Sequence, residues 1–144
     1  MLRVVLDANV FISGLLSEYG PPGRILDAWL EGRFLIFVSV QIINEIQRVL
    51  GYPRLSNRLD PGLADQLIEN LAEYCEITEP KLTLDVLVKD PSDNIYLACA
   101  VEARADSLVT GNLKHYQEAG NPYRGTTIMT PREFLDLIRT DLSQ

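Results

Sequence analysis

The sequence predicts an α/β fold in which helices cover both faces of a mainly parallel β-sheet. Short apolar runs that do not alternate with polar residues recur along the chain. Segments with the 3.6-residue periodicity of helices separate these runs. We find no internal repeat and no linker, so residues 1–144 are expected to form a single domain.

The first apolar run covers residues 2–6 and predicts a buried strand that ends at the polar turn Asp7-Ala8-Asn9. Pro21-Pro22 is a favourable helix start, and Gly32 can end that helix. Residues 34–38 form the second predicted strand. Asp7 is therefore expected at the carboxyl end of the first strand.

An amphipathic helix is predicted after the second strand, with Ser39 as its N-cap. Glu45 lies beside the apolar face of this helix, which Gly51-Tyr52-Pro53 ends. Asp60-Pro61 begins a further helix. The apolar residues at 77, 82 and 84 mark a short strand or an extended linker.

The last part of the chain predicts a turn over residues 90–93 and then a helix over 94–104. This helix is apolar almost all round, as expected of a central helix. Residues 107–110 and 127–129 are further buried strands. Thr130-Pro131-Arg132-Glu133 has the capping-box pattern that begins a final helix.

The composition indicates a globular protein with a core of its own. The 144 residues include 47% hydrophobic and 23% charged residues, which excludes an intrinsically disordered chain. Apolar runs are too short to span a bilayer and the N-terminus lacks a signal-peptide pattern, so we expect a cytoplasmic protein without a membrane partner. Cys75 and Cys99 lack metal-site spacing and are expected to be buried, reduced thiols.

The formal net charge of −7 argues against a nucleic-acid partner, because phosphate backbones are usually bound by clustered lysine and arginine. The objection weakens if several acids bind cations, since bound divalent ions reverse the local charge that a phosphate meets. Arginines are too scattered in the sequence to predict a basic groove: Arg24, Arg33, Arg48, Arg54, Arg58 and Arg104.

Four polar residues are expected to converge at the carboxyl edge of the sheet. Asp7 follows the first strand, Asn112 follows the strand at 107–110, and Asp93 stands in the first turn of the preceding helix. Glu45 can lean toward the same edge from its own helix. Ligands of open α/β sheets bind beyond this edge, near the point where the strand order reverses. These residues form the candidate catalytic site.

An oxygen-only cluster of this kind suits a hard cation such as Mg²⁺ or Mn²⁺. Close carboxylates without a cation would repel one another and raise their pKa values, so the cluster itself favours metal binding. A bound ion would lower the pKa of a water molecule and neutralise charge that develops on a phosphodiester.

Five motifs are spread from Val4 to about Leu137: Leu6-Asp7-Ala8-Asn9, Ser39 with Glu45, residues 93–100, Ala105-Asp106 and residues 108–112. Each motif is common by itself, but their order and spacing together are specific. Together they resemble the motifs of the PIN-domain nucleases. Within this family the chain looks like the VapC-like group, described as toxin components of bacterial and archaeal toxin–antitoxin systems.

The resemblance implies a Rossmann-like α/β/α sandwich with four to five strands, dependence on Mg²⁺ or Mn²⁺, and endonucleolytic cleavage of RNA. Asp7, Glu45 and Asp93 match the three acids of the family's metal site. Asn112 stands where the family often has aspartate, and Lys114-His115 replaces a later aspartate. With one negative charge fewer, the number of bound ions, one or two, is left open.

The resemblance also implies contacts with RNA and with proteins. Asn9, Thr110 and Gly111 are expected to meet the substrate, since a hydroxyl and an exposed amide can bind phosphate. The expected protein partners are an antitoxin, which would offer arginine to the acidic site, and a second copy of the chain in a homodimer. Trp29 and Tyr52 fit either the core or such an interface.

Each candidate residue also has a purely structural interpretation. Asp7 can cap a turn, Glu45 can be an ordinary exposed helix residue, and Asp93 can stabilise a helix N-terminus by about 0.3 to 1 kcal/mol. Asp90 is expected to be a turn residue, with a supporting role beside Asp93 left open. His115, the sole histidine, is expected to lie at the surface.

Other functions fit the motifs less well. An aspartyl phosphatase would carry a second aspartate at the position of Asn9, and a receiver domain would need paired acids after the first strand. A dinucleotide-binding domain would need a Gly-x-Gly-x-x-Gly turn. The main alternative is a PIN-like module that binds RNA or protein without cutting. Asn112 favours that alternative, whereas the three acids argue against it.

Overall fold

A computed structural model describes residues 1–142 and has a five-stranded sheet at its centre. The strand order is β3-β2-β1-β4-β5, and every pair of neighbouring strands is parallel. The prediction of a mainly parallel sheet with four to five strands is confirmed. The strands are β1 (Arg3–Leu6), β2 (Leu35–Val38), β3 (Glu76–Ile77), β4 (Ser107–Val109) and β5 (Thr127–Met129).

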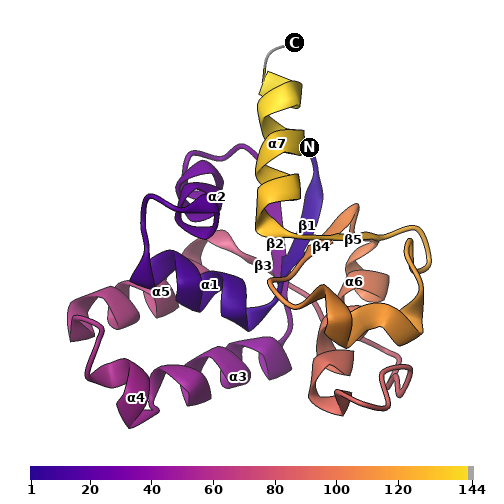
Figure 1. Ribbon diagram of the computed structural model, residues 1–144, viewed down its shortest axis with the longest axis horizontal. Coiled ribbons are helices and arrows are strands. Elements are labelled where there is room, and N and C mark those ends of the chain that lie inside the picture. The colour runs from indigo at the N-terminus through magenta and orange to yellow at the C-terminus, as the bar shows by residue number, and fades with distance from the viewer. Residues whose placement is uncertain (143–144) are drawn as a thin grey trace.

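Helices flank the sheet and complete the predicted α/β/α sandwich (Figure 1). Helix α6 packs on β1, β2 and β4, while α7 packs on β4 and on α2. None of the helices within residues 1–142 has the length and apolar character needed to cross a membrane. The helices are α1 (Ala8–Leu16), α2 (Pro21–Leu30), α3 (Val40–Leu50), α4 (Pro53–Ser56), α5 (Pro61–Tyr74), α6 (Asn94–Ala103) and α7 (Pro131–Leu142), with the 3₁₀ helices η1 (Pro91–Asp93) and η2 (Leu113–Ala119).

The core lies between the central strands and the helices that cover them. Residues 4–6 of β1 are completely buried, and burial of one such Val or Leu side chain contributes about 1.5 to 3 kcal/mol. The rings of Phe34 and Phe134 pack edge to face with their centroids 5.0 Å apart, and this contact joins the start of β2 to α7. Trp29 belongs to this core, whereas Tyr52 is exposed.

The predicted capping signals are confirmed at the starts of α3 and α7. Ser39 Oγ accepts a hydrogen bond of 3.3 Å from the Ile42 N–H. Thr130 N–H donates to Glu133 Oε1 at 3.0 Å, and Glu133 N–H donates to Thr130 Oγ1 at 3.2 Å. These local bonds satisfy N–H groups that the first turn of a helix leaves without partners.

The segment after β1 is a helix, α1, so the prediction of a polar turn there is wrong. Asp7 is the N-cap of this helix, and its Oδ1 accepts a hydrogen bond from the Asn9 N–H. Most of α1 is buried, so its apolar residues do not form the single stripe that periodicity would detect. Gly14 allows α2 to approach, because a Cβ at this position would lie 2.5 Å from Leu26 Cδ1.

The strand order reverses between β1 and β4. At the carboxyl edge, the Asp7 N–H donates a hydrogen bond of 2.9 Å to the Val109 carbonyl and ties the end of β1 to the end of β4. The segments that leave these strands therefore begin side by side. Open α/β sheets bind their ligands at this position.

Candidate active site

Asp7 is the most buried acid of the candidate site, with 5% of its surface exposed. Its Oδ1 accepts from the Asn9 N–H at 3.2 Å. Its Oδ2 accepts from the Thr110 hydroxyl at 3.1 Å and from the Tyr116 hydroxyl at 2.9 Å. Burial, followed by the charge of Asp93, raises the pKa of Asp7, and these three hydrogen bonds oppose the rise. The carboxylate is thus fixed in position, and its charge is poorly compensated.

The loop after β4 connects the predicted substrate-binding residues to Asp7. Gly111 N–H donates to Asn9 Oδ1 at 3.2 Å, and the Asn112 N–H donates to Thr110 Oγ1 at 3.0 Å. Thr110 is completely buried, whereas Gly111 and Asn112 are exposed. The structure therefore brings these four residues together beside Asp7, with only part of the group facing solvent.

Asp93 ends η1 and is the N-cap residue of α6. Its Oδ2 lies 2.9 Å from His115 Nδ1, and His115 Nε2 lies 3.7 Å from Asp90 Oδ1. Burial raises the pKa of Asp93, His115 lowers it, and the charges of Asp90 and Glu45 raise it. His115, which was expected at the surface, keeps 40% of its side chain exposed and lies between two acids. Asp90 thus supports the site through this histidine.

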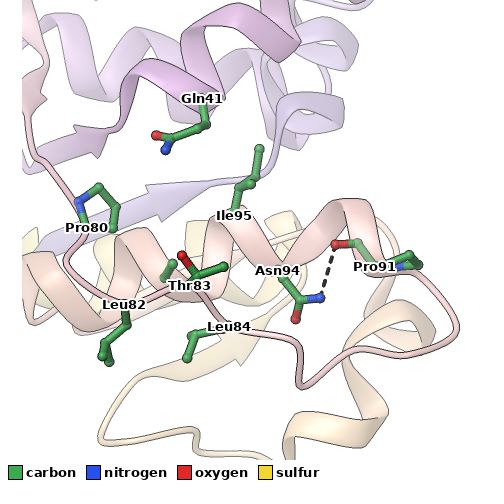
Figure 2. Close-up of a pocket in the computed structure, with 9 residues that line it drawn as sticks. Gln41, Pro80, Leu82, Thr83, Leu84, Pro91, Asn94 and Ile95 are labelled. Atoms are coloured by element: carbon green, nitrogen blue, oxygen red, sulfur yellow. Dashed lines mark hydrogen bonds between the residues drawn. The ribbon is translucent and has the colours of Figure 1, made fainter.

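Asn94 fixes the turn that carries Asp93. Its Oδ1 accepts from the Leu87 N–H at 2.9 Å, and its Nδ2 donates to the carbonyls of Leu87 and Pro91 at 3.1 Å each. Figure 2 shows this side chain turned toward Pro91, beside a hollow of about 190 Å³. The hollow lies between Gln41, the extended segment 80–84 and α6, and its lining in the described part of the chain does not include Asp93. Asn94 therefore holds the backbone turn that positions Asp93.

Glu45 lies on α3, and its carboxylate is held by Arg48 one turn further along the helix. Arg48 Nη2 lies 2.7 Å from both carboxylate oxygens of Glu45, and Nε lies 3.1 Å from Oε2. Burial raises the pKa values of Asp93 and Tyr96, and the charge of Glu45 adds to both shifts. Its oxygens, however, are engaged by a guanidinium rather than directed at Asp7.

The donor chemistry of the site fits a hard divalent cation. Asp7 and Asp93 are acids whose raised pKa values a nearby cation would lower. Within residues 1–142, no three His, Cys, Asp or Glu side chains are arranged closely enough to hold one ion together. Asp7 and Asp93 are therefore the first candidates to hold an ion, while Glu45 would first have to release Arg48.

Two tyrosines of the site were not identified from the sequence. Tyr116 donates to Asp7, and the Tyr96 hydroxyl accepts from the Ala8 N–H at 3.2 Å. Burial raises the pKa of both phenols, so both stay protonated. Tyr96 could have been suspected, because a tyrosine in a helix that is otherwise apolar needs a partner for its hydroxyl. Tyr116 lies in a short helical turn with no such signal.

Comparisons with known proteins agree with this architecture. The uncharacterized protein MJ1680 of Methanocaldococcus jannaschii is 28% identical over 146 residues, which cover 94% of this chain and 90% of the relative. The crystal structure of PAE2754 from Pyrobaculum aerophilum has a similar fold, with a TM-score of 0.60 and 17% identity over 96% of this chain and 90% of that chain. A family profile described as PIN domain matches residues 3–114. The chain therefore belongs to the PIN domain family, whose members are generally nucleases and typically use divalent metal ions.

Proposed function

We propose that this chain is an endoribonuclease that hydrolyses RNA phosphodiester bonds with the help of Mg²⁺ or Mn²⁺. The pairing of Asp7 with Asp93 carries the proposal. These two acids come from segments more than 80 residues apart, and the neighbouring residues His115 and Tyr116 contact Asp93 and Asp7 respectively. Burial raises the pKa of Asp7, and the charge of Asp93 raises it further. A fold that places two such charges in a partly buried edge is expected to compensate them with a cation.

In this proposal the residues of the site have different roles. Asp7 and Asp93 would hold the ion, with Glu45 as a third ligand, and the ion would activate water and neutralise charge on the phosphate. Tyr116 and Thr110 hold Asp7 through their hydroxyl groups. Thr110 is completely buried and therefore acts through Asp7. The loop of Gly111 and Asn112 is exposed beside Thr110 and is suited to contact the RNA. Asn9 supports this loop through its hydrogen bond with Gly111.

Asn112 supplies a neutral amide at the position where the resemblance implies a fourth acid. A neutral oxygen binds a divalent cation less strongly than a carboxylate does, so we propose a single tightly held ion. Its exposed side chain can also bind a water molecule or a phosphate oxygen. Substituting Asn112→Asp would then strengthen Mn²⁺ binding without being required for activity.

We further propose that the protein is the toxin of a toxin–antitoxin pair and forms a homodimer. The support for both partners is the family resemblance together with a hollow of about 210 Å³ between α1, α2 and α5. Leu30 and Leu63 line this hollow and are 46% exposed each. An antitoxin would place arginine against Asp7 and Asp93, since guanidinium groups bind carboxylates in a bidentate manner.

Cleavage of labelled single-stranded and structured RNAs tests the proposed activity. Wild-type protein would be compared with Asp7→Asn in Mn²⁺, in Mg²⁺ and in EDTA, with Asp65→Asn on the exposed face of α5 as a control for the lost charge. We expect metal-dependent cutting by wild type and by the control, and a loss of at least about 1,000-fold in Asp7→Asn.

A non-catalytic binding module is the second candidate function, and the Arg48 contact with Glu45 favours it. A third acid that is paired with arginine can bind a metal ion only after it releases that arginine. Absence of cutting by wild type, together with no rise in melting temperature on adding Mn²⁺, would reject the nuclease and favour this alternative.

A further inference from the structure

Residues 87–93, which we call the acid-bearing turn, lead into α6 and end at Asp93. Leu87 is completely buried and anchors the start of this turn. The next two residues, Val88 and Lys89, are exposed, and the Val88 side chain keeps 72% of its surface in solvent. This part of the turn has little packing of its own, so hydrogen bonds from other segments have to fix its path.

Glu118, on η2, binds the backbone of the acid-bearing turn. Its Oε1 accepts the Val88 N–H at 2.9 Å and the Lys89 N–H at 3.1 Å. Asn94 Oδ1 accepts the preceding N–H, that of Leu87, at 2.9 Å. Two side chains thus hold three consecutive N–H groups. Hydrogen bonds to a carboxylate are stronger than those between neutral groups, so Glu118 ties η2 firmly to the turn.

The same short helix also contacts both acids of the site. His115 Nδ1 lies 2.9 Å from Asp93 Oδ2, and the Tyr116 hydroxyl donates to Asp7 Oδ2 at 2.9 Å. A 3₁₀ helix has about three residues per turn, so His115 and Glu118 lie on one face and Tyr116 points in a different direction. One face of η2 therefore binds the acid-bearing turn, while Tyr116 reaches Asp7.

We propose that Glu118 is a positioning residue that sets the distance of Asp93 from Asp7 and thereby the affinity of the site for Mn²⁺ or Mg²⁺. Glu118 holds the acid-bearing turn by its backbone, while His115 and Tyr116 hold the two carboxylates. Hard divalent cations, Mg²⁺ above all, bind well only when their oxygen ligands are correctly placed. The inference rests on the proposed metal-dependent function and adds to it a residue that touches neither the ion nor the RNA.

The exposure of the two hydrogen bonds separates positioning from stability. Val88 and Lys89 are exposed, so water can accept their N–H groups when Glu118 is removed. The fold then loses little stability, but the acid-bearing turn is no longer held in one conformation. Loss of a group that orients metal ligands typically lowers metal affinity about 10- to 100-fold.

Mn²⁺ binding to the purified full chain, followed by the electron paramagnetic resonance signal of free Mn²⁺, tests the proposal. Glu118→Ala is expected to weaken binding about tenfold. Glu118→Gln removes the charge but keeps an oxygen acceptor, so it should bind within about threefold of wild type. Glu102→Ala is the matched control and should bind like wild type, because Glu102 Oε1 accepts a single N–H, that of Lys81 at 3.1 Å, outside the acid-bearing turn.

The imidazole of His115 provides a second measurement that needs no metal. His115 is the sole histidine, so its ring signals in an NMR spectrum are unambiguous. In EDTA at a fixed pH, Glu118→Ala should shift or broaden these signals, because Asp93 no longer keeps one position beside the ring. Glu118→Gln and Glu102→Ala should leave the signals close to those of wild type.

The proposal is overturned if Glu118→Ala matches wild type in both measurements, or if Glu102→Ala shows an equal loss of affinity. A loss in Glu118→Gln as large as that in Glu118→Ala would assign the effect to charge alone and would also overturn it. Melting temperatures in EDTA show that the variants are folded, and a large fall in Glu118→Ala alone would make the role of Glu118 structural. If wild type binds no Mn²⁺, the proposed nuclease fails, and the His115 signals decide whether Glu118 positions Asp93.

Discussion

Asp7 and Glu45 are both candidate metal ligands, but the structure surrounds them in opposite ways. Asp7 is buried and receives its hydrogen bonds from a backbone N–H and two hydroxyl groups. Glu45 is partly exposed and binds a guanidinium. Neutral donors fix the position of a carboxylate and leave its charge intact. A guanidinium cancels the charge but can be exchanged.

This difference indicates that the two acids have different roles at the same site. The Asp7 side is prepared for a cation before the cation arrives, since orientation is set by groups that have no charge of their own. The Glu45 side is adjustable, because an exposed ion pair contributes only about 0.2 to 1 kcal/mol and is weakened by salt. Substitutions on the two sides should therefore differ in size and in kind.

The largest effect is expected for Asp93→Asn, which removes the second acid of the fixed side. We expect cleavage to fall by at least about 1,000-fold and the Mn²⁺-induced rise in melting temperature to disappear. Asp65→Asn is the control for the lost charge, because Asp65 is exposed on α5. Rates of RNA cleavage and thermal melts measure both. Equal losses in the two variants would show that Asp93 has no special role.

A smaller effect is expected for Tyr116→Phe, which removes one of the hydroxyl donors to Asp7. Loss of this bond raises the pKa of Asp7 further, so the acidic limb of the pH–rate profile should move to higher pH. Cleavage at neutral pH should fall about 10- to 100-fold, as for other groups that orient metal ligands. Tyr96→Phe is the control: it removes the bond to Ala8 and should lower stability by about 1 kcal/mol without moving the profile.

The buried charge of Asp7 also makes stability depend on pH in EDTA. Its folded pKa is raised above the ordinary value of 3.8, so ionisation costs stability above the folded pKa, and this cost vanishes as pH falls toward 3.8. Asp7→Asn should therefore be more stable than wild type at pH 7, and equally stable near pH 4. The hydroxyls of Thr110 and Tyr116 can accept from the new amide. A stability difference that does not change with pH would contradict this account.

The smallest effect is expected for the stability of Glu45→Gln. This change breaks the ion pair with Arg48, which is exposed, so the free energy of unfolding should change by no more than about 0.5 kcal/mol. Urea unfolding measures it, and Glu31→Gln, which breaks the exposed pair with Arg33, is the control. A loss of several kcal/mol would place Glu45 among the fixed elements of the site with Asp7.

The sequence by itself determined the sheet, most of the helices and the edge at which the site lies. Apolar runs, proline and glycine positions and helix-capping residues act over a few residues, so they can be interpreted locally. The same local patterns placed Asp7 after β1 and Asp93 before α6, where the structure has them. They failed for α1, because a helix buried on several sides has no polar face to mark its period.

Only the tertiary structure decided what each acid contacts. The Asp7 carboxylate meets Tyr116 across 109 residues of sequence, and Asp93 meets His115 across 22. Arg48 and Glu45 are close in the sequence, but the sequence alone did not show that they contact each other rather than other residues. Burial and charge at the site depend on which distant segments come together. Local sequence patterns contain no information on which distant segments come together. The direction of the Asp7 pKa shift and the partner of Glu45 can therefore be known only from the folded structure.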